Sequence, residues 1–395
     1  MSGKLRVGVV TAFPPGRNSL NEFGFHLVKH LARQAEVGEV LLYADVTDAG
    51  SPAPLDGVTA YPSWTFNSVT NIVRLTRAIR RTRPDAVLFN LQFATFGDKR
   101  IPGALGLLIP AVLRLFRVPT VVVLHNLADN VDMQDAGFAG SATTARLMKF
   151  AGRILTRALL RADLVALTIP RYVEYLQESY GATNALLAPH GSFEEVAFPS
   201  FGIPDGRRRI LAFGKWGTYK TVDVLVEAYQ ELLDRGYDDL ELVLAGTDSP
   251  NSAGYMQSVA ERFSDLPDLV FTGYVAEEEV APLFSAATVV AFPYTSTTGS
   301  SGVLHQAGEY GRAAVLPRIG DLIDIIEEEG FLGVYFEPGD ATSLADALAE
   351  VLDHPEQRVS LGRRNFAAAS GIPMSEVVHW HLIHIQRLLD RRAMR

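Results

Sequence analysis

The sequence predicts an α/β protein with two doubly wound, Rossmann-like domains, each built on a parallel sheet, that face a common ligand cleft. Short β-rich apolar runs alternate with stretches that have apolar residues at helical spacing, as in parallel sheets covered on both faces. The alternation lapses once, over residues 192–209, where Phe, Pro and Gly follow no sustained period, which indicates an interdomain linker. A length of 395 residues also suits two domains better than one core.

In the first half of the chain, strands and helices are expected to alternate from the first apolar run onward. Right-handed crossovers should then place the helices on both faces of one sheet. The predicted strands cover 5–10, 37–44, 86–90, 120–125, 164–168 and 185–188, and the predicted helices cover 25–31, 69–81, 104–116, 143–160 and 171–180.

The second half repeats this pattern and ends in a helix. The predicted strands cover 210–213, 240–245, 270–273, 288–292, 313–317 and 333–336. The predicted helices cover 222–233, 255–263, 280–285, 303–310, 322–328 and 344–352, and a last apolar stripe covers 377–389. We therefore expect domains at 1–198 and 199–375, with residues 376–395 forming a helix that packs back on the first domain.

Composition excludes several classes of site and partner. The chain has no cysteine, which excludes disulfides, thiolate metal sites and cysteine nucleophiles. Its net charge is −9, but residues 1–200 hold 20 Lys and Arg against 16 Asp and Glu, whereas residues 201–395 hold 16 against 29. An acidic chain without an aromatic-studded basic stripe argues against nucleic acid as the main ligand.

The sequence favours a cytoplasmic location. The first apolar run, within residues 1–13, is a short β-rich strand with no cleavage site after it, so no signal peptide is expected. The most membrane-like segment, residues 101–113, is too short to span a bilayer and is broken by Pro102 and Pro110. A buried helix is the better interpretation of this segment.

Two lysines lie where α/β proteins bind phosphates. Lys215 and Lys220 follow the strand at 210–213 and precede the amphipathic helix that begins at Val222. Cations beside backbone N–H groups and a helix N-terminus can hold a diphosphate. On this loop alone, two solvated surface lysines are an equally good interpretation.

The wider sequence around these lysines resembles the retaining glycosyltransferases of family 4, also called glycosyl transferases group 1, which have the two-domain GT-B fold. Gly214-Lys215 leads through Lys220-Thr221 into an apolar-Glu-Ala-aromatic helix, and residues 270–280 match a second family segment. The resemblance implies that 1–198 binds an acceptor, that 199–375 binds a nucleotide-sugar donor, and that Gly214, Lys215 and Lys220 contact the donor diphosphate. Lysine in the family's arginine position keeps the charge but loses the bidentate fork. Tyr274 and Val275 could contact the base or only pack.

The chain departs from the family where two glutamates are expected. The resemblance puts Thr298 and Gln306 in their places, beside the sugar and the ribose respectively. Gln306 can still hydrogen-bond a diol, whereas Thr298 supplies no carboxylate. The small residues between them could bring backbone N–H groups to phosphate or sugar oxygens. These residues are Gly299, Ser300, Ser301 and Gly302.

In the first half, His125 ends a predicted strand and resembles the family's active-site histidine. It could hydrogen-bond the sugar or the acceptor, with a structural role as the alternative. The loop after the first strand lacks the family's Gly-Gly pair. The residues expected on the acceptor side are Arg17, Asn18, Asn21, Glu22, His125 and Asn126.

The reaction that the resemblance implies is transfer of a hexose, with retention, from a UDP- or GDP-sugar to a sugar, lipid-linked or small-molecule acceptor. Lys215, Lys220 and the helix start at Ser300-Ser301 would stabilise the departing phosphate, with His125 as the third catalytic residue. No cofactor and no metal are expected; His379, His381 and His384 lack an accompanying acidic or cysteine ligand. The alternatives are a catalytically silent GT-B subunit that binds a nucleotide or partner, and a GT-B sugar-nucleotide epimerase.

Two predicted helices of the first half are rich in cations. Arg74, Arg77, Arg80, Arg81 and Arg83 lie on or beside one, and Arg146, Lys149, Arg153, Arg157 and Arg161 punctuate another. They could contact anionic lipid at the inner face of the membrane, or they could be ordinary solvated faces. The sequence leaves both open, as it does the sugar, the base, the acceptor and the oligomeric state.

Overall fold

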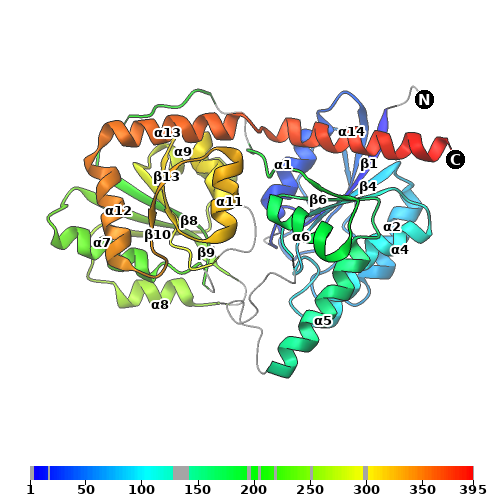
Figure 1. Ribbon diagram of the computed structural model, residues 1–395, viewed down its shortest axis with the longest axis horizontal. Helices are drawn as coiled ribbons and strands as arrows, with labels where there is room; N and C mark the ends of the chain where they lie inside the picture. Colours follow the sequence, from blue (N-terminus) through cyan, green and yellow to red (C-terminus); the bar gives the residue numbers. More distant parts are fainter. Residues whose placement is uncertain are drawn as a thin grey trace. The chain divides into compact units, whose positions relative to one another are not determined.

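The protein forms two compact units, each with its own parallel sheet (Figure 1). The computed structural model describes residues 4–16, 18–127, 142–193, 197–202, 206–217, 220–249, 252–296 and 301–394, with the backbone alone at 142–149, 321, 324, 325 and 327. Within these residues, unit 1 comprises 4–127, 142–191 and 374–394, and unit 2 comprises 192–373. The sequence analysis placed the two boundaries at 198/199 and 375/376.

Unit 1 is built on seven parallel strands in the order β3-β2-β1-β4-β5-β6-β7. All six residues of the central strand β4 are buried, because helices cover both faces of a parallel sheet. The short strand β3 is mostly exposed and was not predicted. The strands are β1 (Leu5–Val10), β2 (Val37–Tyr43), β3 (Val58–Ala60), β4 (Ala86–Leu91), β5 (Thr120–Leu124), β6 (Leu164–Leu167) and β7 (Ala185–Leu187).

The helices of unit 1 lie in two layers (Figure 1). The chain runs from β1 outward to β2, and from β4 outward in the opposite direction, so right-handed crossovers put the two sets of helices on opposite faces. The direction reverses between β1 and β4, the switch point of this sheet. One layer holds α2 (Asn71–Thr82), α3 (Arg100–Leu107), α4 (Ile109–Leu115), α5 (Ala142–Leu159) and α6 (Pro170–Tyr180); the other holds α1 (Asn21–Ala32) and α14 (Met374–Ala393).

The single helix predicted over 104–116 is wrong, since the structure has α3 and α4 with a break at Leu108. Pro110 lies in the first turn of α4. A proline inside a helix lacks the N–H donor and clashes with the preceding turn, so a new helix begins here instead. Two short helices therefore cross this part of the sheet.

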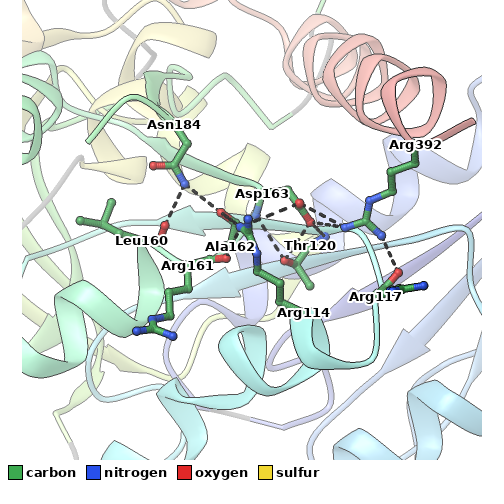
Figure 2. Close-up of polar contacts among 9 residues, drawn as sticks. All are labelled: Arg114, Arg117, Thr120, Leu160, Arg161, Ala162, Asp163, Asn184 and Arg392. Atoms are coloured by element: carbon green, nitrogen blue, oxygen red, sulfur yellow. Dashed lines mark hydrogen bonds and ion pairs between the residues drawn. The ribbon is translucent and has the colours of Figure 1, made fainter. Parts of the chain in front are cut away.

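The end of the C-terminal helix α14 is held to the rest of unit 1 by a polar cluster around Asp163 (Figure 2). The Arg392 guanidinium donates to both carboxylate oxygens of Asp163, at 2.9 and 3.1 Å, and to the carbonyl of Arg117. The same carboxylate accepts the backbone N–H of Thr120 at 2.9 Å. Arg114 lies beside it and donates to the carbonyl of Arg161 at 2.6 Å. The cluster thus joins α14 to the N-terminal edge of β5.

Unit 2 is built on six parallel strands in the order β10-β9-β8-β11-β12-β13, with its switch point between β8 and β11. The predicted α/β class is confirmed in both units. The strands are β8 (Arg208–Trp216), β9 (Leu240–Asp248), β10 (Leu269–Gly273), β11 (Val289–Ala291), β12 (Ala313–Pro317) and β13 (Gly333–Phe336). The helices are α7 (Asp223–Asp234), α8 (Tyr255–Arg262), α9 (Glu277–Ser285), α10 (Gly302–Glu309), α11 (Gly320–Glu329), α12 (Ala341–Asp353) and α13 (Pro355–Ser370).

Helix α13 was not predicted, because its buried face is not apolar. Its buried residues recur at helical spacing but are Arg358, Gly362, Asn365 and Ala369. A Cβ on Gly362 would lie 2.3 Å from the carbonyl oxygen of Gly311, so α13 packs here backbone against backbone. Asn365 adds a hydrogen bond from Nδ2 to the carbonyl of Arg312, at 3.1 Å. This close packing fixes the position of α10.

Replacing Arg392 with alanine should loosen α14 without unfolding either sheet. The free energy for opening α14, measured by amide hydrogen exchange, should fall by about 1.5–3 kcal/mol, the range for hydrogen bonds to charged groups. The matched control is Arg391→Ala, which removes the neighbouring exposed arginine and should change it by less than about 0.5 kcal/mol. Equal exchange in the two variants would rule out the anchoring role.

Candidate functional site

Lys215 lies within strand β8, not in the loop where the sequence analysis placed it. The strand continues three residues past its predicted end, and Lys215 pairs in register with Thr247 of β9. The next residue, Trp216, is fully buried and donates from Nε1 to the carbonyl of Ala245 at 2.9 Å. The indole hydrogen bond ties the end of β8 to β9. The half-buried Lys215 therefore lies at the carboxyl edge of the sheet.

Beside Lys215, strands β8 and β9 approach so closely that a side chain would not fit. Gly214 and Gly246 are register partners. A Cβ on Gly246 would lie 1.8 Å from the carbonyl oxygen of Gly214, and Gly246 has φ 114°, in the region that favours glycine. The glycine at 246 is therefore required by the backbone geometry that places Lys215.

Lys220 makes contacts on both sides of the switch point of unit 2. Its backbone exchanges two hydrogen bonds with Gly217, the residue after β8, at 2.9 and 3.2 Å. It also forms an antiparallel bridge with Tyr294, which follows β11. The Lys220 ammonium lies 4.3 Å from the centre of the buried Tyr294 ring, a cation–π contact. Lys220 is thereby joined to Tyr294, which follows the neighbouring strand β11.

The N-terminus of α7, expected to help bind phosphate, is already occupied by protein groups. The N–H of Val222 donates to Tyr255 Oη at 2.7 Å, and this hydroxyl donates to the carboxylate of Asp223. Arg262 forms an ion pair with the same carboxylate. A carboxylate in the first helical turn satisfies the positive end of the helix dipole, so α7 adds little to an anion site.

Helix α10 begins at the edge of the sheet where β11 ends. Two buried side chains support its first turn. Ser301 is its N-cap, and the 5% exposed side chain has no hydrogen-bond partner for Oγ among the described residues. The fully buried His305 contacts the Ser301 carbonyl through Nδ1 at 3.0 Å, and its Nε2 lies 2.7 Å from Glu329. A carbonyl can only accept, so Nδ1 carries a proton.

The His305–Glu329 pair favours a charged imidazole in spite of its burial. Burial by itself lowers the pKa of His305, but the Glu329 carboxylate and the Ser301 carbonyl outweigh it, so the pKa is raised above its usual value. Removing one partner would leave the other buried and unpaired. The pair therefore holds Ser301 at the start of α10.

The remaining donor-side residues are only partly brought together. Gly302 begins α10, and Gln306 is buried within it. Tyr274 is exposed and Val275 half-buried after β10, the edge strand, two strands away from β8. Thr298, Gly299 and Ser300 lie outside the described residues. The structure thus groups Gly214, Lys215, Lys220, Ser301 and Gly302 about the β8/β11 switch point and leaves Tyr274 and Val275 at the sheet edge.

In unit 1, three buried polar side chains form a chain across the carboxyl ends of β1, β4 and β5. His125 Nε2 lies 2.7 Å from Asn90 Oδ1, and Asn90 Nδ2 donates to Thr11 Oγ1 at 2.9 Å. The Thr11 hydroxyl donates in turn to the carbonyl of Ala12. Because the amide oxygen of Asn90 accepts, the proton of a neutral His125 is on Nε2, and Nδ1 keeps a lone pair.

Aromatic rings enclose His125. The Phe23 ring packs edge-on against it, with centroids 4.5 Å apart, and the His190 ring lies 6.0 Å away. Burial lowers the pKa of His125 to about 3, so the imidazole is neutral at physiological pH. It is suited to accept or donate a hydrogen bond, but not to supply a positive charge.

The other acceptor-side residues mostly bond to the protein itself. Asn18 Nδ2 donates to Asp45 at 2.6 Å, and Asn21 Nδ2 donates to the carbonyl of Gly16 at 2.8 Å. Asn126 Oδ1 accepts the backbone N–H of Phe93. Glu22 lies in the first turn of α1, and Arg17 lies outside the described residues. These asparagines shape the loops around the strand ends.

Several residues of these sites were not anticipated from the sequence. Asn90 and Asp45 each stand at the end of a buried apolar run, a signal that could have found them. Asp45 accepts the N–H of Phe13, and burial raises the pKa of its carboxyl in spite of these bonds. Tyr294 and His305 carried no signal, since an aromatic and a histidine are both common in cores.

A metal centre is not found among the side chains described by the structure. None of their His, Asp and Glu residues form a group of three that could hold an ion. On α14, His381 is fully buried, His379 is exposed, and His384 packs on Trp380.

Comparison with known proteins finds a family match within unit 2. Residues 207–354 match the family model described as "Glycosyl transferases group 1". The chain is 27% identical over 281 residues to the D-inositol 3-phosphate glycosyltransferase of Corynebacterium efficiens. It is 29% identical over 166 residues to the GDP-mannose-dependent alpha-mannosyltransferase of Corynebacterium glutamicum. These matches cover 65% and 42% of this chain, and 64% and 36% of the length of the two relatives.

Solved structures match over nearly the whole chain. The sucrose-phosphate synthase of Thermosynechococcus elongatus superposes with a TM-score of 0.77 at 17% identity, covering 98% of this chain and 100% of that one. The Anabaena protein Alr3699/HepE, solved in complex with UDP-glucose, gives 0.68 at 15% identity, with the same coverage. The expected GT-B fold and the expected resemblance to glycosyl transferases group 1 are confirmed.

Replacing Gly246 with alanine should displace the end of β8 that carries Lys215. The matched control is Gly236→Ala, since Gly236 has φ 95° but no atom within 4 Å of a Cβ. Both variants incur backbone strain of about 1–3 kcal/mol, and only Gly246→Ala adds an overpacking cost of about 1–3 kcal/mol. Urea unfolding of unit 2 should resolve this difference. Equal destabilisation of the two would show that the glycine contact is not tight.

Proposed function

We propose that this chain, whose residues 207–354 are a domain of the glycosyl transferases group 1, transfers a hexose from a nucleotide-diphosphate sugar to an acceptor, with retention at the anomeric carbon. The observation that carries the proposal is the pair of half-buried lysines at the β8/β11 switch point, one in register on β8 and one bridged to Tyr294. Ligands of open α/β sheets bind at such points. Lys215 and Lys220 are therefore assigned to the donor diphosphate.

The start of α10 supplies the second half of this diphosphate site. The unpartnered Oγ of Ser301 can donate to a phosphate oxygen, and His305 with Glu329 keeps it in place. Gln306, buried in the same helix, is assigned to the ribose hydroxyls. Donor recognition thus needs no carboxylate at position 306.

The reaction breaks the bond between the anomeric carbon and the donor phosphate and forms a bond from that carbon to the acceptor oxygen. The leaving phosphate takes the proton of the acceptor hydroxyl on the same face of the sugar, so no protein nucleophile is required. Negative charge grows on the phosphate in the transition state, where Lys215 and Lys220 stabilise it. We propose that these cations make the reaction independent of a metal.

In unit 1, His125 is assigned to a sugar hydroxyl. Its Nε2 proton is directed at Asn90, so Nδ1 can accept a hydrogen bond from a hydroxyl of the donor or the acceptor. Asn90 and Thr11 then act as positioning residues, because they set the tautomer and the ring orientation.

The donor is proposed to be a UDP- or GDP-sugar and the acceptor a sugar, a lipid-linked sugar or a small molecule. The Anabaena protein crystallised with UDP-glucose and the relative named for GDP-mannose support this donor class. We also propose a cytoplasmic location with peripheral contact at an anionic membrane. This rests on the arginines of α2 and on the exposed Ile101 and Leu115 of α3 and α4.

Two alternatives remain, a catalytically silent nucleotide-binding subunit and a sugar-nucleotide epimerase. Thr298 in place of a glutamate favours the first, since it removes a carboxylate from the sugar end. A panel of nucleotide sugars, incubated with and without acceptors, separates them. Release of nucleoside diphosphate with a new glycoside supports transfer; binding without turnover supports the silent subunit, and conversion to an epimeric nucleotide sugar supports the epimerase.

Replacing either lysine with alanine should slow transfer more than it weakens sugar binding. Lys215→Ala and Lys220→Ala should each lower kcat by about 100- to 1000-fold, as removal of a transition-state charge partner does. They should also reduce the thermal shift produced by UDP or GDP. Lys4→Ala, which removes an exposed lysine of unit 1, is the control. Full activity in both site variants would refute the diphosphate assignment.

Replacing Asn90 should act through His125. Asn90→Leu removes the acceptor for Nε2–H and should lower kcat/KM by about ten-fold, the value of one buried hydrogen bond. Asn90→Asp keeps an acceptor, but its carboxylate raises the pKa of His125, so activity should fall as pH falls through that raised pKa. The unaltered protein, with a His125 pKa of about 3, should show no such inflection between pH 5 and 8. An unchanged pH profile in Asn90→Asp would exclude the coupling.

A further inference from the structure

Two arginines are buried at the amino edge of the sheet of unit 2, the edge opposite the proposed donor site. Arg312 directly precedes β12, and Arg358 lies in the first turn of α13, which follows α12 in the chain (Figure 1). Each residue is only 4% exposed. Because arginine is almost never buried without a partner for its charge, both residues raise the question of what neutralises them.

The packing of α13 against the connection between α10 and β12 fixes the place of Arg358. Gly362, one turn after Arg358, meets the backbone of Gly311. Asn365, one turn further on, donates to the carbonyl of Arg312 at 3.1 Å. The helix therefore holds Arg358 beside Arg312 without any bond from the Arg358 side chain itself.

The hydrogen-bond donors of Arg312 are satisfied by carbonyl groups alone. Its Nε donates to Tyr310 at 2.7 Å, its Nη1 to Ala287 at 3.0 Å, and its Nη2 to Ser200. Carbonyl oxygens accept hydrogen bonds but carry no net charge. No described carboxylate forms an ion pair with Arg312, so it remains a buried cation.

Arg358 has fewer partners still. Its buried Nη1 has no hydrogen-bond partner among the described residues, and none of their carboxylates lies within ion-pair distance of the side chain. The acidic residues closest to it in the chain do not help. Asp353 accepts a hydrogen bond from Tyr237 Oη at 2.6 Å, and Glu356 is exposed. A buried charge without a partner disfavours the folded state strongly.

A third arginine adds positive potential to this edge without supplying a carboxylate to the other two. Arg208, at the start of β8, donates to both oxygens of Asp239, at 2.5 and 2.7 Å. Burial lowers the pKa of Arg358 and of Arg312, and a neighbouring arginine lowers each further: Arg208 acts on Arg358, and Arg358 acts on Arg312. Guanidinium groups nevertheless stay charged in proteins. Two positive charges are therefore left unbalanced by the described carboxylates.

We propose that Arg358 and Arg312 form a binding site for a phosphate-type oxyanion, either inorganic phosphate or the phosphate group of a small metabolite. A phosphate can carry two negative charges, which matches the two unbalanced arginines better than a single carboxylate does. The unpartnered Nη1 of Arg358 provides a charge-assisted hydrogen bond to a phosphate oxygen. Water could accept that hydrogen bond, but it would leave both charges unbalanced.

This anion site is separate from the proposed donor site. Helix α10 begins at the carboxyl edge after Ser301 and ends at the amino edge shortly before Arg312. Its eight residues span about 12 Å, at 1.5 Å per residue. Since the anion site uses no residue assigned to the donor or the acceptor, it can be tested whatever reaction the chain catalyses.

The test is equilibrium dialysis of the full chain against radiolabelled inorganic phosphate, at an ionic strength held constant with chloride. The Lys215→Ala with Lys220→Ala variant serves as the background, because the donor site could bind the same ion. We expect saturable phosphate binding in this background. Adding Arg358→Gln should weaken it by roughly 10- to 100-fold, as loss of a hydrogen bond to a charged group does. Arg358→Lys, which keeps the charge but loses the fork, should weaken it less.

Arg363→Gln is the matched control. Arg363 is an exposed arginine on the other face of α13, 5.7 Å from the centre of the Phe201 ring, and its removal should leave phosphate binding unchanged. Thermal unfolding without phosphate separates a binding role from a structural one. Arg358→Gln should not lower the Tm there, because replacing an unbalanced buried charge with a neutral side chain removes its desolvation cost.

Competition identifies the source of the phosphate group. A hexose phosphate that displaces the label at lower concentration than unlabelled phosphate would indicate a phosphorylated metabolite. Displacement by unlabelled phosphate alone would indicate the free ion. Both results support the site.

Three results would overturn the proposal. The first is no saturable phosphate binding in the background that lacks both lysines, which would leave the donor site as the only place for the ion. The second is equal loss of binding in Arg358→Gln and Arg363→Gln. The third is a lower Tm of Arg358→Gln in the absence of phosphate, which would make Arg358 a structural residue.

Discussion

The candidate site of unit 2 depends on the bridge between Lys220 and Tyr294 across the β8/β11 switch point. Strands on the two sides of a switch point are followed by connections that leave in opposite directions, so a crevice opens between them. The bridge and the cation–π contact hold Lys220 against Tyr294, which follows β11. Lys215, one strand position before the buried Trp216, is thereby kept at the same edge.

The carboxyl edges of the two sheets present different chemical groups. In unit 2 the carboxyl edge presents cations and a helix start, which suits a phosphate. In unit 1 the corresponding edge holds the neutral chain Thr11–Asn90–His125, in which burial keeps the imidazole uncharged. Fixed neutral groups discriminate by hydrogen-bond direction rather than by charge, which suits hydroxyl groups. The two edges differ in charge because different polar side chains stand at their strand ends.

Outside these edges, polar and small residues fix the positions of helices that apolar packing alone would not determine. Asp163 joins α14 to the rest of unit 1 through Arg392, and glycines at 246 and 362 let backbones meet in unit 2. His305 and Glu329 brace the start of α10 from within the core. On the outer surface of unit 1, by contrast, Arg77 and Arg81 of α2 lie in no ion pair with any described residue.

The sequence by itself determined the fold class and nearly all strands, because buried parallel strands are read directly from apolar runs. It also singled out Lys215, Lys220 and His125 as candidates, from their places at the ends of such runs and from the family resemblance. It did not reveal α13, whose buried face is Arg, Gly, Asn and Ala and therefore has no apolar period. It placed Lys215 in a loop, since a lysine ends an apolar run even when the hydrogen-bonded strand continues. Asn90, Tyr294 and His305 emerged only from the tertiary structure, because their roles are contacts with residues 35, 74 and 24 positions away in the chain.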